Sequence, residues 1–265
     1  MDDKYLVEIK TVQSSAFRIL VEALKEILTD ANLELDNTGI KVMAMDSSHT
    51  VLVHLKLNSE NFESFYCKNK VILGINMINL FKLIKTMGNN DTLTLYLEQE
   101  NQSLLGIKIE NSEKNSVTDY KLNLMDLNET NIQIPPATFE SVITMPSTDF
   151  QKICRDMHNL ADDIEIKSVG QQLLFSCKGD FAEQETCIGE ANSGMTFLKN
   201  QNPDEIVQGV FALKHLVLFS KCTNLCNSIE IYLKNDYPLI IKYTVASLGH
   251  IKLCLAPKYE DMNTN

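Results

Sequence analysis

Apolar residues recur at spacings of three and four positions in four separate stretches of the chain. The stretches are 17–28, 77–87, 150–160 and 213–222, and this spacing predicts four helices that each bury one face. Each predicted helix is followed by stretches in which apolar and polar residues alternate, as in strands with one buried face. The N-terminal stretch MDDKYLVEIK also predicts a strand, and the others cover 33–36, 40–45, 51–57, 92–98, 104–110, 116–124, 163–167, 172–177, 183–188, 228–234, 238–245 and 250–255.

The pattern occurs twice. Residues 79–98 and residues 215–234 each contain an apolar helical stripe with lysines, then a polar break, then an alternating strand with Tyr-Leu near its end. Two pairs of landmarks give nearly the same offset, because Phe17 and Phe150 are 133 positions apart and Tyr96 and Tyr232 are 136 apart. This regularity predicts two similar halves. Since predicted strands outnumber helices, the expected fold class is α+β with mostly antiparallel sheet.

A connector separates the two halves. Residues 124–139, LMDLNETNIQIPPATF, have no helical period and contain a Pro-Pro pair, which is typical of an extended segment. We therefore expect an N-terminal domain over 1–123, a connecting loop over 124–139 and a C-terminal domain over 140–265. The apolar residues of the connector have two interpretations: they lie on the body of the protein, or they help to form a docking site.

Composition restricts the class of protein. Of the 265 residues, 44% are hydrophobic and 22% are charged, which is globular composition. No apolar run reaches the ~20 residues that span a bilayer, and the N-terminus lacks the features of a secretory signal, so we expect no membrane partner. The seven cysteines are scattered and include no C-x-x-C pair. An odd number of cysteines in this arrangement favours free thiols in a reducing compartment.

The distribution of charge is uneven. The net charge of −11 comes from 24 basic and 35 acidic residues, and an acidic protein on average repels nucleic acid. However, each predicted helix carries two basic residues at i, i+3 or i, i+7 spacing, which places both on one side of the helix. The pairs are Arg18 and Lys25, Lys82 and Lys85, Lys152 and Arg155, and Lys214 and Lys221.

These basic pairs have two interpretations. Solvated helix faces commonly carry Lys and Arg, and the nearby Glu22, Glu26 and Asp156 could pair with them. Alternatively, if the repeats place all four helices on one surface, the pairs form a basic stripe on an acidic body. Spaced cations without aromatic platforms suit duplex phosphates better than single strands. Because no helix carries a base-reading set of Arg, Asn and Gln, the second interpretation predicts non-specific binding of double-stranded DNA.

The sequence offers no catalytic or metal site that withstands inspection. Cys154 and His158 are i, i+4 on one predicted helix, but Cys154 lies on the apolar stripe and no third group orients the pair. His49 and His54 are five positions apart on extended chain, so they point to opposite faces and do not chelate one metal. The chain also lacks a glycine-rich nucleotide loop. We therefore expect a protein that is not an enzyme, with no catalytic residues, metal or cofactor.

The repeated units also predict self-association. Repeats that carry strands at both ends leave sheet edges open, and an unpaired edge readily pairs with another copy of the chain. A head-to-tail contact that closes on itself produces a ring. The residues alone therefore favour a repeated α+β unit in a ring with a basic helical face.

Four motifs then give the sequence a family resemblance. They are Met45-Asp46-Ser47-Ser48-His49, Leu124-Met125-Asp126-Leu127, Ile153-Cys154-Arg155-Asp156 and Leu255-Ala256-Pro257-Lys258. In order and spacing they resemble proliferating cell nuclear antigen, the eukaryotic-type DNA sliding clamp, over about residues 5–261. The resemblance implies a non-enzymatic homotrimer with a pseudo-sixfold ring of similar domains, in which helices surround duplex DNA and antiparallel sheets form the rim. Such a processivity factor tethers DNA polymerase and other replication and repair proteins, and a clamp loader opens and closes it.

The resemblance also assigns roles to residues. It makes the eight basic helix residues the DNA-binding set. The implied partner-binding set, which receives a short helical turn with one aliphatic and two aromatic anchors, is Met45, His49, Leu52, Ile132, Ile134, Pro238, Ala256 and Pro257. The chain departs from the family at Cys254, where a pocket tyrosine is usual, and at Gly170, where the family has a lysine that carries regulatory ubiquitin or SUMO. Tyr120, on the edge strand of the implied subunit interface, does match.

The resemblance implies a location in the nucleus, or at the site of DNA replication if the protein is viral. Two alternatives stay open: a clamp-like interaction scaffold that never encircles DNA, and one subunit of a heterotrimeric checkpoint-type clamp. The mass of the purified assembly distinguishes them, since only a homotrimer fits the main prediction.

Overall fold

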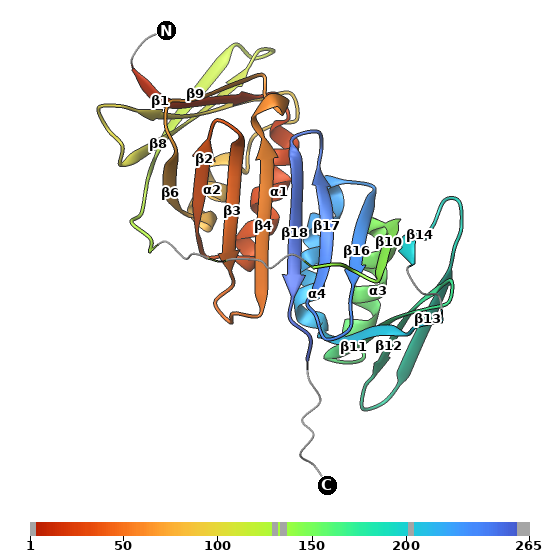
Figure 1. The fold of residues 1–265 in the computed structure, drawn as a ribbon. Helices are drawn as coiled ribbons and strands as arrows, with labels where there is room; N and C mark the ends of the chain where they lie inside the picture. The colour runs from red at the N-terminus through yellow and green to blue at the C-terminus, as the bar shows by residue number, and fades with distance from the viewer. Residues whose placement is uncertain (1–3, 129–131, 133–136, 201–203, 259–265) are drawn as a thin grey trace. The chain divides into compact units, whose positions relative to one another are not determined.

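The computed structural model describes residues 4–128, 132, 137–200 and 204–258. The chain divides into two compact units (Figure 1). Unit 1 consists of Met1–Gln133 with Thr244–Ile251, and unit 2 consists of Ile134–Tyr243 with Lys252–Asn265. Within the described ranges, each unit contains two α-helices and two layers of strands.

Unit 1 contains α1 (Ser14–Ile27) and α2 (Met77–Ile84), which pack against each other. One strand layer has the order β5-β1-β7-β8-β9, and the other runs β4-β3-β2-β6. Neighbouring strands in both layers are antiparallel. The strands are β1 (Tyr5–Thr11), β2 (Asp30–Asp36), β3 (Gly39–Met45), β4 (Val51–Asn58), β5 (Ser64–Cys67), β6 (Val71–Asn76), β7 (Thr92–Glu98), β8 (Leu104–Asn111) and β9 (Ser116–Asn123), and the 3₁₀ turn η1 covers Ser59–Asn61.

Unit 2 repeats this plan with α3 (Ser147–His158) and α4 (Leu213–Phe219). One layer has the order β13-β12-β11-β15, and the other runs β14-β10-β16-β17-β18. α3 packs against α4 and against the 3₁₀ segment η2 (Ser220–Leu225). The strands are β10 (Ser141–Pro146), β11 (Asp163–Val169), β12 (Gln172–Lys178), β13 (Glu183–Gly189), β14 (Thr196–Asn200), β15 (Val207–Ala212), β16 (Ser228–Leu233), β17 (Leu239–Val245) and β18 (Gly249–Leu255).

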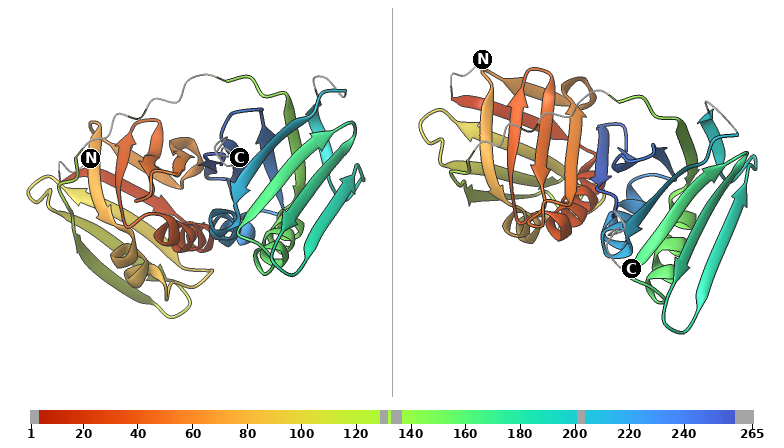
Figure 2. Two further views of the ribbon diagram at one scale, coloured as in Figure 1. Left: turned by 90° about the horizontal axis from the view of Figure 1, so that it is seen from below. Right: turned by 60° about the horizontal axis from the view of Figure 1, so that its bottom comes forward.

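The apolar face of each helix forms the core of its unit. Figure 2 shows the two helices of each unit beside its strand layers. Leu20 and Leu24 of α1 are buried, as are Phe150 and Met157 of α3. Burying one such side chain contributes roughly 1.5–3 kcal/mol. The amphipathic period therefore fixes which face of each helix points inward and which faces solvent.

The four predicted helices are confirmed, with shifted ends. α1 and α3 each begin three residues before the first apolar landmark, at Ser14 and Ser147. Both serines are buried, and their hydroxyls donate to the carbonyl oxygens of Gly88 at 3.0 Å and Cys226 at 2.7 Å. This shared contact supports the repeat. In the part of the chain that the structure describes, no helix is both long and apolar enough to cross a membrane.

The structure contains five strands that the pattern did not predict: β5, β6, β10, β14 and β15. Three of them, β6, β10 and β15, run directly into α2, α3 and α4. Each strand continues into its helix with no loop between them, so the change of period from two to 3.6 is hard to locate. The predicted α+β class is confirmed.

Residues 36–39 form the turn of the β2–β3 hairpin. Asp36 pairs with Gly39 across the two strands. Gly39 has a φ of 139°, and a Cβ atom there would lie 1.9 Å from the carbonyl oxygen of Leu57. The Asp36 carboxylate accepts the Thr38 N–H at 2.7 Å. Hydrogen bonds from the side chains of Thr38 and Lys41 hold the pKa of Asp36 well below its ordinary value.

Candidate functional site

The two predicted cations of α1 are engaged by their own chain. Arg18 is half-buried, and its Nη2 donates to Asn89 Oδ1 at 3.5 Å. Lys25 forms an ion pair with Glu26, and its Nζ lies 4.8 Å from the centroid of the Phe81 ring on α2. A cation over a ring face is attracted by the ring quadrupole, so Lys25 links the two helices. These contacts restrict both cations as ligands for an external anion.

The two cations of α2 are more available. Lys82 and Lys85 are exposed, whereas Leu80 and Ile84 of the same segment are buried. Neither lysine has an ion-pair partner among the residues that the structure describes. Both lie near the C-terminal end of the helix, where a cation complements the helix dipole. α2 therefore presents two unpaired positive charges to solvent.

The predicted cations of unit 2 are all exposed. Lys152 and Arg155 lie on α3, Lys214 lies on α4, and Lys221 lies on η2. None of the four forms an ion pair within the described ranges. The predicted i, i+7 spacing of Lys214 and Lys221 assumes one continuous α-helix, but α4 ends at Phe219, between the two lysines. The 3₁₀ segment that follows has about 3.0 residues per turn instead of 3.6.

Acidic residues are present on only the first helix of each unit. Glu22 and Glu26 are exposed on α1, and Asp149 and Asp156 are exposed on α3. The sequences of α2, α4 and η2 contain no Asp or Glu. The positive helical surface is therefore strongest on the second helix of each unit. The sequence contained this signal, but the pairing of basic residues by spacing alone did not use it.

Three predicted partner-binding residues of unit 1 surround the β3–β4 connection. Met45 ends β3 and pairs with Leu52 on β4. His49 lies in the connecting loop and has a φ of 55°, in the left-handed region that residues with a Cβ atom seldom occupy. Met45 and His49 are exposed and Leu52 is half-buried. Ile132 is half-buried in unit 1, and Ile134 lies outside the described residues.

Unit 2 contains the other predicted partner-binding residues, the half-buried Pro238, the exposed Ala256 and the half-buried Pro257. Lys258, the next residue, holds this segment against the sheet. Its backbone N–H donates to the carbonyl oxygen of Val210 on β15 at 2.8 Å, and its ammonium donates to the Asp163 carboxylate at 2.7 Å. Local pattern did not reveal this contact, because 95 positions separate Lys258 from Asp163.

Cys154 and His158 do not form a nucleophile and base. Cys154 is fully buried, whereas His158 is exposed. Burial raises the pKa of the Cys154 thiol far above neutrality and raises the pKa of Cys222 to about 12. Both thiols are therefore protonated and inert near neutral pH. Across the described residues, no group of three or more His, Cys, Asp and Glu side chains is arranged to hold a metal ion.

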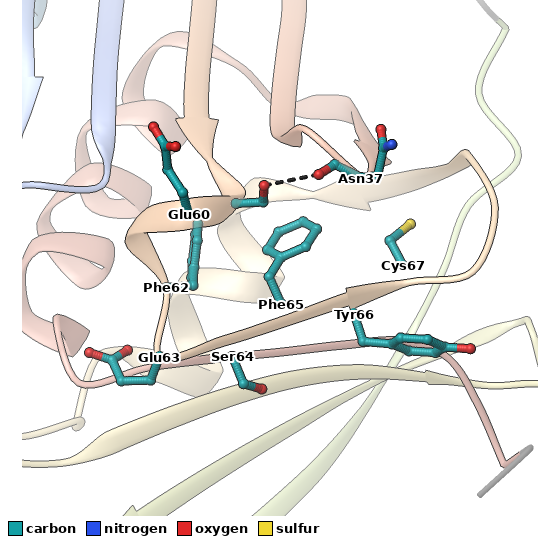
Figure 3. A pocket seen from close by; sticks show the side chains of 9 residues that line it. Asn37, Glu60, Phe62, Glu63, Ser64, Phe65, Tyr66 and Cys67 are labelled. Carbon is teal, nitrogen blue, oxygen red and sulfur yellow. Dashed lines mark hydrogen bonds between the residues drawn. The ribbon is translucent and has the colours of Figure 1, made fainter. Parts of the chain in front are cut away.

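A separate hollow of unit 1 lies beside η1 and β5 (Figure 3). The side chains of Phe65 and Cys67 point to the same side of β5, and the Ser59 hydroxyl donates to the carbonyl oxygen of Asn37 at 2.9 Å. The lining residues are Asn37, Ser59, Glu60, Phe62, Glu63, Ser64, Phe65, Tyr66 and Cys67. It contains none of the predicted DNA-binding or partner-binding residues.

Comparison with known proteins identifies the family. A model described as "Proliferating cell nuclear antigen, N-terminal domain" matches residues 6–131, and one described as "Proliferating cell nuclear antigen, C-terminal domain" matches residues 133–258. The chain belongs to the proliferating cell nuclear antigen family. It is also 38% identical over 260 residues to "Probable DNA polymerase sliding clamp 1" of Paramecium bursaria Chlorella virus 1, over 97% of this chain and 98% of that protein. The resemblance carried by the four motifs is thereby confirmed.

Membership of the proliferating cell nuclear antigen family also confirms the predicted pair of similar clamp domains. Two departures from the family pattern now have a structural setting. Cys254 is 8% exposed on β18, and burial raises the pKa of its thiol to about 11. Gly170 has a φ of 60° in the β11–β12 turn, a backbone conformation that a lysine would adopt only with strain. The nearby Lys167 is half-buried, and its Nζ lies 3.5 Å from Glu165 Oε2.

Proposed function

We propose that this protein is a DNA sliding clamp, a processivity factor that encircles duplex DNA and tethers DNA polymerase and other replication and repair proteins. The observation that carries the proposal is the match of both family domains over residues 6–131 and 133–258. The viral relative, whose name is that of a DNA polymerase sliding clamp, supports it over nearly the full chain. Of the two expected locations, the nucleus and the site of DNA replication of a virus, the viral source of this relative supports the second.

A homotrimeric ring accounts for two long open sheet edges. β9 lies at one edge of the five-stranded sheet and has eight residues, and β13 lies at one edge of the four-stranded sheet and has seven residues. Every residue of β9 except the half-buried Tyr120 and the buried Leu122 is exposed. An unpaired edge presents N–H and C=O groups that bind another strand. In the proposed ring, β9 of one copy pairs with β13 of the next, and the head-to-tail contact closes after three copies.

Duplex DNA is the proposed occupant of the ring. Phosphates are a target independent of base sequence, and the exposed cations of the second helices have no ion-pair partners among the described residues. An acidic remainder repels DNA elsewhere on the protein and favours the helical surface. The proposed DNA-facing set is Lys82, Lys85, Lys214 and Lys221 first, with Lys152, Arg155, Arg18 and Lys25 in support.

Partner proteins are proposed to bind at Met45, His49, Leu52, Ile132, Ile134, Pro238, Ala256 and Pro257. A partner of this family inserts a short helical turn with one aliphatic and two aromatic anchors. Each well-buried anchor contributes roughly 1.5–3 kcal/mol to binding. A clamp loader is proposed to open the ring. In this proposal the protein positions other enzymes on DNA and needs no cofactor or catalytic residue of its own.

A loader-free topological experiment tests the proposal. The purified protein is mixed with a linear duplex that carries biotin at both ends, and streptavidin is added either before or after the protein. We expect retention through a high-salt wash only when the ends are blocked afterwards, because a ring threads over an open end and is then trapped. Equal retention in both orders of addition overturns encirclement.

Native mass spectrometry of the same preparation separates the alternatives. We expect a homotrimer, because the chain carries both edge strands of the proposed contact. A monomer that binds partner peptides favours an interaction scaffold. A trimer that forms only with a second kind of chain favours a heterotrimeric checkpoint-type clamp.

A further inference from the structure

One carboxylate closes the loop between β3 and β4. Asp46 directly follows β3, and its Oδ1 accepts the N–H groups of Thr50 and Val51, each at 2.8 Å. Its Oδ2 accepts the hydroxyl of Ser48. The backbone closes the same loop, because Asp46 N–H donates to the carbonyl oxygen of Val51 at 2.9 Å and His49 N–H donates to that of Asp46 at 3.0 Å. Asp46 therefore forms hydrogen bonds with Ser48, His49, Thr50 and Val51.

The loop has few other contacts among the described residues. The Ser48 hydroxyl also donates to Thr50 Oγ1 at 3.0 Å, and the Thr50 hydroxyl donates to the carbonyl oxygen of Ser48 at 3.3 Å. Ser47, Ser48 and His49 are exposed, so their side chains do not fix the loop by packing into a core. His49 also occupies the left-handed region at a φ of 55°. Such a conformation persists only where the surrounding structure determines it. Asp46 supplies most of these contacts, because its side chain accepts three hydrogen bonds within the loop.

We propose that Asp46 is a positioning residue for partner binding, whose carboxylate holds the loop in the conformation that presents Met45 and His49 beside Leu52. The inference rests on the proposed partner-binding function. Met45 and Leu52 pair across β3 and β4, so the loop extends directly from an ordered part of the sheet. A loop that is already ordered loses less conformational freedom when a partner binds, which increases affinity.

Two substitutions at one position separate the hydrogen bonds from the charge. Asp46→Ala removes all three acceptor contacts of the side chain. Asp46→Asn retains an oxygen for the two backbone N–H groups, and Asn is nearly equal to Asp as a cap of this kind. The probe is a fluorescent synthetic peptide that carries one aliphatic and two aromatic anchors on a helical turn. We expect Asp46→Ala to raise its Kd about tenfold, and Asp46→Asn no more than about threefold.

Asp36→Ala is the matched control. Asp36 caps the β2–β3 turn in the same way, by accepting the Thr38 N–H at 2.7 Å. It lies at the other end of β3, whose seven residues span about 20 Å. Both Ala variants remove one carboxylate from a turn, so they should lower the melting temperature comparably. We expect the control to bind the peptide with a Kd within about twofold of the wild type.

Wild-type affinity in Asp46→Ala overturns the inference. An equal loss of affinity in Asp36→Ala also overturns it, because general destabilisation then explains the effect. If Asp46→Ala does not fold, Ser48→Ala removes the donor to Asp46 Oδ2, together with the contact of the same hydroxyl with Thr50 Oγ1, and we expect a rise in Kd of about two- to threefold. Unchanged affinity in that variant overturns the inference. If the wild-type protein itself does not bind the peptide, the proposed partner-binding function fails first, so the two failures are distinct.

Discussion

Reversal of the charge on α2 is the most direct test of where this clamp contacts DNA. Lys82→Glu/Lys85→Glu changes the net charge by −4, from −11 to −15. Both side chains are exposed and neither contributes to the buried face of the helix. Lys and Glu have similar helix propensities, so we expect the fold and the proposed homotrimer to persist. Any loss of DNA binding then reports on the charges themselves.

The salt dependence of binding sets the magnitude of this effect. Each phosphate contact that is lost reduces the magnitude of the negative slope of log K against log salt by about 0.9. Loss of both lysines from one α2 therefore reduces this magnitude by about 1.8, and their loss from all three copies of the proposed trimer reduces it by about 5.4. We expect a decrease between these limits. Even at the lower limit, the ratio of the DNA affinity of the wild type to that of the α2 variant changes about tenfold when the salt concentration rises fourfold.

The assay measures threading onto a short linear duplex with open ends, by fluorescence anisotropy at several salt concentrations. The matched control is Lys10→Glu/Lys70→Glu, which changes the net charge equally. Lys10 and Lys70 are also exposed, but they lie outside the helices and already face Glu110 at 3.9 Å and Glu34 at 2.8 Å. We expect the control to retain the wild-type slope. A wild-type slope in the α2 variant, or an equal decrease in the control, refutes the reasoning from unpaired helix cations.

Two further predictions concern buried polar groups of unit 2. Tyr243→Phe should raise the free energy of unfolding by about 1 kcal/mol, because the fully buried hydroxyl has no hydrogen-bond partner among the described residues and such a group costs about 1–3 kcal/mol. Chemical denaturation measures this, and a decrease in stability would contradict it. At about pH 8, iodoacetamide should alkylate the exposed Cys187 and spare Cys154 and Cys222, since burial raises the pKa of both thiols and only the thiolate reacts. Peptide mass spectrometry detects the adducts, and equally fast labelling of Cys222 would contradict the prediction.

Local pattern predicted the helices because each has one buried face, and the period of that face appears in the order of the residues. The same reasoning failed at β6, β10 and β15, where a short strand enters a helix without an intervening loop. It also extended the last helix beyond Phe219, where the chain continues as a 3₁₀ segment. Apolar periodicity marks buried positions, but hydrogen bonding decides where one type of helix ends and another begins.

The sequence predicted which residues form the candidate site. It did not predict which of them are exposed and which are held by other side chains. Lys25 and Lys82 look alike in the sequence, as basic residues on amphipathic helices. In the structure Lys25 is held by Glu26 and by the ring of Phe81, which is 56 positions away, whereas Lys82 is exposed without an ion-pair partner among the described residues. The difference arises from packing between α1 and α2, which no local window of sequence contains.

By itself the sequence determined the internal repeat, the α+β class, the position of the eight helix cations and the family. Periodicity and the order of motifs are properties of the linear chain, so they can be seen without coordinates. Only the tertiary structure decided which cations remain unpaired, which strands lie at sheet edges, and how Lys258 fastens the segment after β18 to Val210 and Asp163. These features depend on solvent exposure and on contacts between distant positions, and both arise only when the chain is folded.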